Sequence, residues 1–163
     1  MIEAVIFDLD GTLIHLPIDY EQLIQEFQKV AQAESFHPLL EAVSKLDEVA
    51  RGRVFEIWDL AELAASARMT VNQEGMKLYS FFATKPKALV TMQGKAVVNA
   101  ILEKLGLTLD FVLTREDSLS RVEQLKMAVQ KLEVSFENVL FVGNSENDVL
   151  AAKQVMCSFQ RIQ

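Results

Sequence analysis

The stretch Phe7-Asp8-Leu9-Asp10-Gly11-Thr12-Leu13 closes the first apolar run of the chain, residues 4–7. On an extended strand Asp8 and Asp10 point to the same side, and Gly11 lets the backbone turn where a side chain would clash. Ligands of open parallel sheets bind beyond the carboxyl ends of the strands, so two carboxylates there indicate a site for Mg²⁺ and a phosphate. Taken alone, the same residues also suit a plain turn that ends a strand.

Four further apolar segments have the character of strands. Their apolar residues are continuous rather than alternating, which is typical of parallel strands buried on both faces. They are residues 88–90, 111–113, 139–142 and, more weakly, 158–162. Helical patterns lie between them at 95–105, 120–132 and 145–155, and the second opens with a capping box of Ser120 and Glu123. This alternation predicts an α/β fold built on a Rossmann-like, doubly wound parallel sheet.

One long segment, residues 14–72, breaks the alternation because it contains no convincing strand. Its apolar residues predict three helices at 19–33, 38–50 and 54–68, with Arg51-Gly52-Arg53 as the break before the third. The apolar face that the third helix is expected to bury consists of Ile57, Leu60, Leu63 and Ala64. We therefore expect a helical insert at 14–72 and a core formed by residues 1–13 and 73–163.

The amino-acid composition of the chain limits the kinds of molecule that it is expected to bind. The chain has 163 residues, half of them hydrophobic, and 23 acidic against 16 basic residues give a net charge of −7. This balance suits a globular domain and disfavours binding to nucleic acid or to an anionic membrane. The single cysteine, Cys157, permits neither an intrachain disulfide nor a cysteine zinc site. Without a signal-like start or a membrane-spanning run, we expect a cytoplasmic protein, either a monomer or a homodimer.

Three motifs stand in the order that is typical of the haloacid dehalogenase-like hydrolase superfamily. Residues 7–13 resemble its motif I, Leu89-Val90-Thr91 resembles motif II, and residues 142–148 resemble motif IV. The helical insert after the first strand is similar to the small cap of the phosphoglycolate phosphatase-like subgroup. The resemblance covers nearly the whole chain. It implies a Mg²⁺-dependent phosphatase that hydrolyses a small phosphorylated metabolite through an aspartyl-phosphate.

The resemblance also implies roles for the matching residues. Asp8 would be the nucleophile. Asp10 would protonate the leaving oxygen and later deprotonate the attacking water, with a pKa that its like-charged neighbour raises. Thr91 would bind the phosphoryl oxygens, helped by backbone N–H groups at the start of the following helix. Gly11 and Thr12 of motif I would contact the substrate as well.

The usual form of the family's motif III, a Lys followed by Pro, is missing between the third and fourth core strands. Arg121 lies in the first turn of a predicted helix at the carboxyl edge of the sheet. It is our first candidate for the cation that neutralises the phosphate and Asp8. Lys126 and Arg115 are the second and third candidates. The basic residues of the insert that could bind a substrate carboxylate or a second phosphate are Arg51, Arg53 and Arg68.

The metal ligands implied by the resemblance are Asp8, Asp10, Asn144 and Asp148, with Mg²⁺ as the ion. Asn144 departs from the family pattern, in which an aspartate most often stands at this position. The amide still offers a carbonyl oxygen, but the site loses one negative charge. We therefore expect weaker Mg²⁺ binding than in a fully acidic site.

Three alternatives compete with the phosphatase. A phosphomutase of the same superfamily would use the same residues. The asparagine at position 144 and the missing Lys-Pro pair are compatible with a weakly active relative that binds phosphorylated metabolites or a protein partner. Retention of both Asp8 and Asp10 argues against that second reading. A phospho-receiver domain is disfavoured, because its phosphorylated aspartate follows the third strand, whereas Thr114 stands there in this chain.

Overall fold

The computed structural model describes residues 1–163 and contains one five-stranded sheet. Its strands are β1 (Ala4–Phe7), β4 (Lys87–Val90), β5 (Phe111–Leu113), β6 (Val139–Gly143) and β7 (Ser158–Arg161). They are arranged in the order β5-β4-β1-β6-β7, and every neighbouring pair is parallel. Phe7 of β1 aligns with Leu89 on one side and with Val142 on the other. The predicted Rossmann-like parallel sheet is confirmed.

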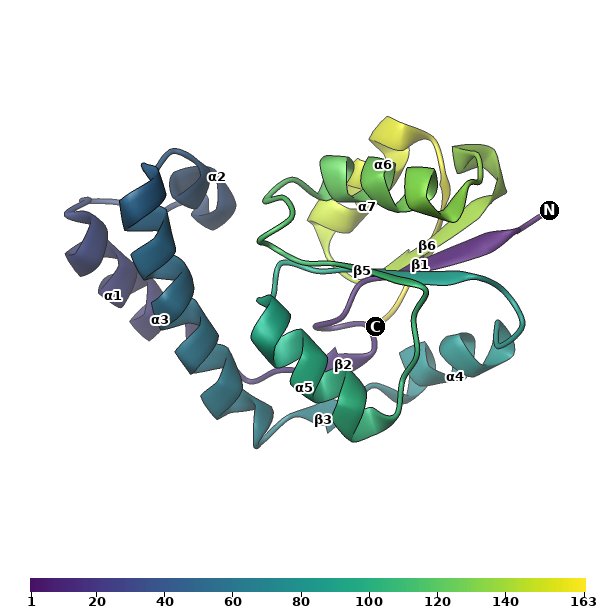
Figure 1. Cartoon of the computed structure of the whole chain (residues 1–163), viewed down its shortest axis with the longest axis horizontal. Coiled ribbons are helices and arrows are strands. Elements are labelled where there is room, and N and C mark those ends of the chain that lie inside the picture. Colours follow the sequence, from purple (N-terminus) through teal and green to yellow (C-terminus); the bar gives the residue numbers. More distant parts are fainter.

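Helices cover both faces of this sheet (Figure 1). One face carries α4 (Gln73–Phe81) and α5 (Lys95–Leu105), and the other carries α6 (Arg121–Leu132) and α7 (Glu146–Val155). Successive residues of β1 point to opposite faces, so Val5 packs with α5 while Ile6 packs with α6 and α7. None of the helices combines the length and the apolar character that a membrane span requires.

The segment between β1 and β4 contains the two short strands β2 (Ile14–His15) and β3 (Thr70–Val71). They pair antiparallel and enclose the helices α1 (Tyr20–Ala31), α2 (Leu39–Ser44) and α3 (Glu48–Ser66), which stand to one side of the sheet (Figure 1). The expectation that this segment has no strand was wrong. Strands of two residues are too short to leave a periodic pattern, and only their pairing across the insert defines them.

The boundary between the second and third insert helices also differs from the prediction. α3 begins at Glu48 and runs through Arg51-Gly52-Arg53, so the break predicted there was wrong. Asp47 caps the helix by accepting a hydrogen bond from the Ala50 N–H at 2.8 Å. The Arg51 guanidinium donates to the Leu46 carbonyl at 2.8 Å, which ties the start of α3 to the preceding turn.

α3 buries a different face from the predicted one. Its buried residues are Val54, Trp58, Glu62 and Ala65. Leu60, which the pattern placed inside, is 69% exposed. Trp58 decides the orientation, because its ring packs against Phe27 of α1 with the ring centroids 5.6 Å apart. The side chain of Glu62 follows one turn later on the same face and meets a buried arginine of the core.

Candidate active site

The turn after β1 is built so that Asp8 and Asp10 reach the carboxyl edge of the sheet. The Leu9 carbonyl accepts hydrogen bonds from the N–H groups of residues 12–14, at 2.9 to 3.2 Å. Gly11 has a φ of +83°, and a Cβ at this position would overlap the Asn144 amide. A glycine is therefore required where the turn passes against the β6–α7 loop. Because β1 and β6 are the strands at which the sheet order reverses, this is the position where ligands bind such folds.

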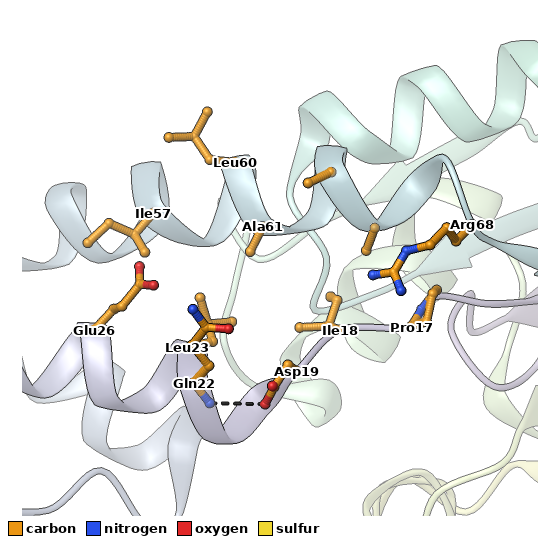
Figure 2. A pocket seen from close by; sticks show the side chains of 12 residues that line it. Pro17, Ile18, Asp19, Gln22, Leu23, Glu26, Ile57, Leu60, Ala61 and Arg68 are labelled. Atoms are coloured by element: carbon orange, nitrogen blue, oxygen red, sulfur yellow. Dashed lines mark hydrogen bonds between the residues drawn. The ribbon is translucent and has the colours of Figure 1, made fainter.

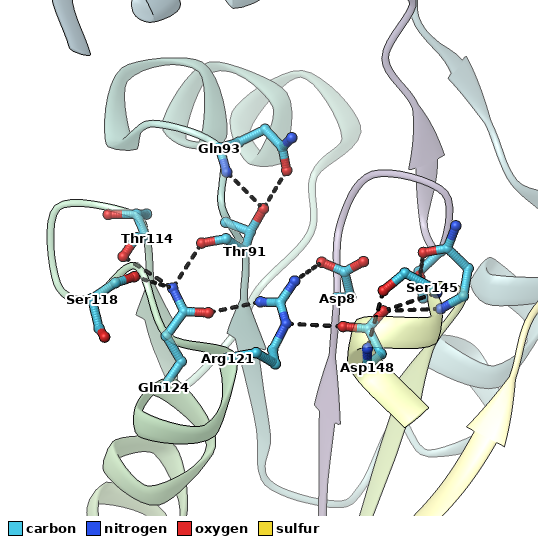
Figure 3. Close-up of polar contacts among 11 residues, drawn as sticks. Asp8, Thr91, Gln93, Thr114, Ser118, Arg121, Gln124, Ser145 and Asp148 are labelled. Atoms are coloured by element: carbon cyan, nitrogen blue, oxygen red, sulfur yellow. Dashed lines mark hydrogen bonds and ion pairs between the residues drawn. The ribbon is translucent and has the colours of Figure 1, made fainter. Parts of the chain in front are cut away.

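Arg121 joins the first and last predicted motifs (Figure 3). Its Nη2 lies 3.1 Å from Asp8 Oδ1, and its Nε lies 2.9 Å from Asp148 Oδ1. All three side chains are buried. Lys126 instead pairs with Glu123 at 3.2 Å on the exposed surface of α6. Of the three cations proposed from the sequence, the structure places Arg121 beside Asp8.

Gln124 is a buried residue of this site that the sequence interpretation missed. Its Oε1 accepts a hydrogen bond from Arg121 Nη1 at 2.7 Å. Its Nε2 donates to the carbonyls of Thr91 at 2.9 Å, and of Thr114 and Ser118 at 3.1 Å each (Figure 3). Gln124 therefore fixes the guanidinium relative to the end of β4. The sequence did indicate this position, because Gln124 lies three residues after Arg121 and therefore on the same face of the helix.

Most polar groups at the end of β4 already have hydrogen-bond partners within the protein. The Thr91 hydroxyl donates to Gln93 Oε1 and accepts from the Gln93 N–H at 3.1 Å. The next two N–H groups, at the start of α5, also have partners. Gly94 donates to Glu62 Oε1 at 3.0 Å, and Lys95 donates to the Glu116 carboxylate at 3.2 Å. The N–H groups of residues 93–95, among those that we expected to bind phosphate, are thus occupied by the protein's own oxygens.

Asp10 lies in a partly buried position beside the insert. Its Oδ1 accepts a hydrogen bond from the Leu16 N–H at 2.8 Å. Burial raises the pKa of Asp10, and the Leu16 N–H and the nearby His15 offset part of that rise. We had expected the neighbouring acid to raise the pKa of Asp10, but the main cause of the rise is burial. A carboxyl with a raised pKa holds a proton that it can donate to a leaving group.

Asp8 has the most strongly perturbed carboxyl of the site. Burial raises its pKa to about 7, Arg121 opposes the rise, and the charges of Asp148 and Asp10 add to it. Asp8 is therefore ionised only above about neutral pH while no further cation is bound. A buried carboxylate with one guanidinium partner at a sheet edge can act as a nucleophile toward an electrophile of negative charge.

The sequence of residues 83–162 matches the family model described as haloacid dehalogenase-like hydrolase. This part of the chain, 80 of its 163 residues, therefore has the sequence pattern of the haloacid dehalogenase-like hydrolases. No curated protein sequence matches it significantly. The matched residues run from the loop before β4 to the end of β7 and include Thr91, Arg121, Asn144 and Asp148. The first motif and the insert lie outside the match, so their assignment in this haloacid dehalogenase-like chain rests on fold and residue pattern.

Solved structures support the haloacid dehalogenase-like fold over the whole chain. A haloacid dehalogenase-like family hydrolase from Streptococcus pneumoniae superposes with a TM-score of 0.72 and 17% identity, covering 99% of this chain and 85% of that one. A candidate phosphoglycolate phosphatase from Lactobacillus plantarum superposes with a TM-score of 0.69 and 19% identity, covering 97% of this chain and 84% of that one. A candidate beta-phosphoglucomutase from Thermotoga maritima superposes with a TM-score of 0.65 and 20% identity, covering 99% of this chain and 86% of that one. At these identities the similarity shows the fold alone.

The family implies Mg²⁺ as the metal ion. The residues expected to bind this ion differ in how many hydrogen bonds and ion pairs their oxygen atoms already make within the protein. No group of three or more His, Cys, Asp or Glu side chains is arranged to hold a metal. Asp148 serves as the capping-box residue of α7: its Oδ2 accepts from the N–H groups of Asn144 at 3.2 Å and Ser145 at 3.1 Å, while its Oδ1 meets Arg121. Asp8, Asp10 and the Asn144 amide still offer the hard oxygen atoms that Mg²⁺ prefers. These residues fit a weakly held ion, with Arg121 supplying part of the positive charge.

Asn144→Asp is therefore expected to tighten Mg²⁺ binding. Asn144 lies against Gly11, and its Oδ1 is 3.5 Å from the Thr12 hydroxyl, so an aspartate would put a second unpaired charge at the motif I turn. We expect the dissociation constant for Mg²⁺ to fall by about tenfold, which calorimetry at pH 8 would measure. An unchanged dissociation constant would remove position 144 from the metal site. Asn99→Asp, on the exposed surface of α5, is the control.

The basic residues of the insert do not reach this haloacid dehalogenase-like site. Arg51 donates to the Ser44 and Leu46 carbonyls at the α2–α3 turn, and Arg53 is exposed. Arg68 lines an open groove of about 400 Å³ between α1 and α3 (Figure 2). Apart from Arg68, none of the residues predicted to bind substrate or metal, or to act in catalysis, lines this groove.

Proposed function

We propose that the protein is a Mg²⁺-dependent phosphatase that hydrolyses a small phosphomonoester through an aspartyl-phosphate on Asp8. The observation that carries the proposal is the pairing of buried Asp8 with Arg121, with Asp10 two residues further along the same turn. This arrangement provides a nucleophile, a fixed positive charge for the phosphoryl oxygens and a second carboxyl for proton transfer. The family match supports the coarser assignment to a hydrolase.

In the first step an Asp8 oxygen forms a bond to phosphorus while the bond from phosphorus to the leaving oxygen breaks. Asp10 transfers its proton to that oxygen, so the product leaves as a neutral alcohol. In the second step Asp10 takes a proton from a water molecule whose oxygen attacks the same phosphorus atom. The Asp8–phosphorus bond breaks and inorganic phosphate is released. Mg²⁺, held by Asp8, Asp10 and Asn144, would neutralise charge on the phosphoryl oxygens.

Residues 14–72 would form the cap over this site, and the core would comprise residues 1–13 and 73–163. A cap so close to Asp10 suits a small metabolite better than a phosphorylated macromolecule. The Leu16 N–H that bonds Asp10 belongs to the segment that enters this cap. Gly11 and Thr12 in the turn after β1, and Thr91 directly after the neighbouring strand β4, would contact the phosphoryl group.

The test is hydrolysis of 4-nitrophenyl phosphate at pH 8, with Mg²⁺ and with a chelator present. The expected result is release of phosphate that requires the metal and that saturates with substrate. Turnover that is equally fast in the chelator would overturn the metal requirement. Absence of hydrolysis for this ester and for a panel of small phosphomonoesters would overturn the phosphatase. Transfer of phosphate to added sugar phosphates without net release would establish the phosphomutase instead.

A further inference from the structure

A buried arginine connects the insert to the core. Arg115 lies in the loop of residues 114–120 between β5 and α6, and its side chain is fully buried. Its Nη1 lies 2.8 Å from Glu62 Oε1, and its Nη2 pairs with Asp59. The guanidinium also stacks over the Trp58 ring, with Cζ 4.4 Å from the ring centroid. All three partners belong to α3, so the insert holds this loop through Arg115.

The same loop has a second attachment to the insert, because Leu119 packs against the hydrophobic cluster of the insert helices. Hydrogen bonds within the loop join the two attachments. The Thr114 N–H donates to Asp117 Oδ2 at 2.8 Å, and the Ser118 N–H donates to the Thr114 carbonyl at 3.3 Å. The Ser120 N–H donates to Ser118 Oγ at 3.1 Å. A displacement of either attachment therefore also moves the carbonyl groups of Thr114 and Ser118.

Gln124 of α6 binds these two carbonyl groups. Its Nε2 donates to the carbonyls of Thr114 and Ser118 at 3.1 Å each and to that of Thr91 at 2.9 Å (Figure 3). Carbonyl oxygens only accept hydrogen bonds, so the amide nitrogen has to face them and the amide oxygen has to point the other way. In that orientation Oε1 accepts from Arg121 Nη1 at 2.7 Å.

Arg121 uses its three nitrogen atoms for three different partners. Nη2 lies 3.1 Å from Asp8, Nε lies 2.9 Å from Asp148, and Nη1 is bound by Gln124. Of these partners, Gln124 is the one whose side chain also bonds to the loop that the insert holds. Because the guanidinium is planar and rigid, a movement of Nη1 also changes how Nη2 faces Asp8.

We propose that Gln124 is a positioning residue that couples the docking of the insert to the placement of Arg121. The insert holds the loop through Arg115, the loop holds the Gln124 amide, and the amide holds the guanidinium that faces Asp8. The charge beside Asp8 is then correctly placed only while the insert is docked. The effect on turnover rests on the proposed function, whereas the coupling itself can be measured without a substrate.

The first measurement follows the Arg121 Nε–H signal in a proton–nitrogen NMR spectrum at pH 8. Arg121→Lys removes this signal and so assigns it. Asp59→Asn weakens the hold of the insert on Arg115 and is expected to shift the Arg121 signal. Gln124→Met removes the amide but keeps the length of the side chain. In the Gln124→Met background we expect Asp59→Asn to leave the signal in place, because the connection between the two sites is missing.

Three variants complete the measurement. Glu56→Gln removes an exposed charge from the same helix and should not shift the Arg121 signal in either background. Leu119→Ala weakens the second attachment and should act as Asp59→Asn does. Gln124→Glu replaces Gln124→Met if that variant does not fold, since an ionised carboxylate can still accept from Arg121 but cannot donate to the three carbonyls.

Two results would overturn the coupling. A shift caused by Asp59→Asn that persists in the Gln124→Met or Gln124→Glu background would mean that the effect reaches Arg121 through space and not through Gln124. A signal that neither Asp59→Asn nor Leu119→Ala shifts would mean that the insert does not influence Arg121 at all.

Turnover shows whether the coupling serves the proposed function. With 4-nitrophenyl phosphate at pH 8, Gln124→Met is expected to lower kcat by about 10- to 100-fold with little change in KM, because Arg121 loses its orientation toward the phosphoryl group. Asp59→Asn should lower kcat by about three- to tenfold alone and should add nothing in the Gln124→Met background. Equal losses in both backgrounds would contradict the positioning role. If no ester is hydrolysed, the proposed function fails, and the Arg121 signal still decides the coupling.

Discussion

Asp8→Asn is expected to reduce the hydrolysis of phosphomonoesters by a factor on the order of 10⁴ or more. The amide that replaces the carboxylate cannot form the phosphoryl bond, and no other carboxylate reaches the same position. Asp148 is held by Arg121 and by two backbone N–H groups, and Asp10 has the role of the acid. Residual turnover near the wild-type level would show that phosphorus is attacked by another group, most simply by water.

The same substitution is expected to stabilise the fold above neutral pH. The pKa of Asp8 is about 7 in the folded protein, against 3.8 for the unconstrained side chain, mainly because the carboxyl is buried. Between these two values the unfolded chain loses a proton that the folded chain keeps, so the wild-type protein loses stability as the pH rises from about 4 to 7. Asparagine has no charge to desolvate. We expect a gain of at most about 4 kcal/mol at pH 8, and little difference at pH 4.5.

Urea unfolding at the two pH values measures this difference. Asp47→Asn serves as the control, because Asp47 is an exposed helix cap and asparagine caps equally well. A difference between wild type and Asp8→Asn that is the same at pH 4.5 and pH 8 would contradict the raised pKa. Loss of activity combined with a gain in stability is the behaviour expected of a functional residue rather than a structural one.

The core of this fold could be read from the sequence because its three central strands, β4, β1 and β6, are buried on both faces. Such strands leave continuous apolar runs, and the polar residue that ends each run marks the edge where ligands bind. Arg121 could be placed for the same reason: a helix that follows a core strand starts at that edge. The placement of Asp8, Asp148 and Arg121 in one contact network agrees with that reasoning.

Residues buried through partners distant in sequence could not be found this way. Glu62 occupies a position where an apolar residue is the usual choice, and its burial depends on an arginine 53 residues further along the chain. Two faces of α3 contain apolar residues, and periodicity favours Ile57 and Leu60 as much as Val54 and Trp58. The packing of Trp58 on Phe27 and Arg115 settles the choice, and neither contact has a local signal in the sequence.

Arg121→Ala is expected to lower kcat/KM by about 10² to 10³, because a fixed charge that faces the phosphoryl oxygens is lost. The substitution also removes the opposing effect on the pKa of Asp8, which would rise above its value of about 7. Since the nucleophile must be ionised, the rate increases with pH through the pKa of Asp8, which bound Mg²⁺ would lower in both proteins. The ascending limb of the pH–rate profile should therefore move to higher pH in the variant, whereas a merely structural defect would scale the profile without moving it.

Arg121→Lys and Lys126→Ala complete the experiment. The lysine keeps the charge but cannot contact Asp8, Asp148 and Gln124 with three separate nitrogen atoms, so we expect partial recovery of the rate and a profile near that of the wild type. Lys126 is exposed and pairs only with Glu123, so its removal should change neither rate nor profile.

Stability supplies an independent readout for the Arg121 variants. Arg121→Ala leaves Asp148 buried without its charged partner, which costs about 3 to 5 kcal/mol when one member of a buried pair is removed. Kinetics are therefore compared at a temperature where circular dichroism shows both proteins folded. If Arg121→Ala still turned over at the wild-type rate, another cation would have to face the phosphate. Arg115 is already matched by two carboxylates, and Lys126 lies on the solvent side of α6, so Mg²⁺ would then carry the whole charge. In that case the rate of the variant should depend more steeply on Mg²⁺ concentration than the wild-type rate does.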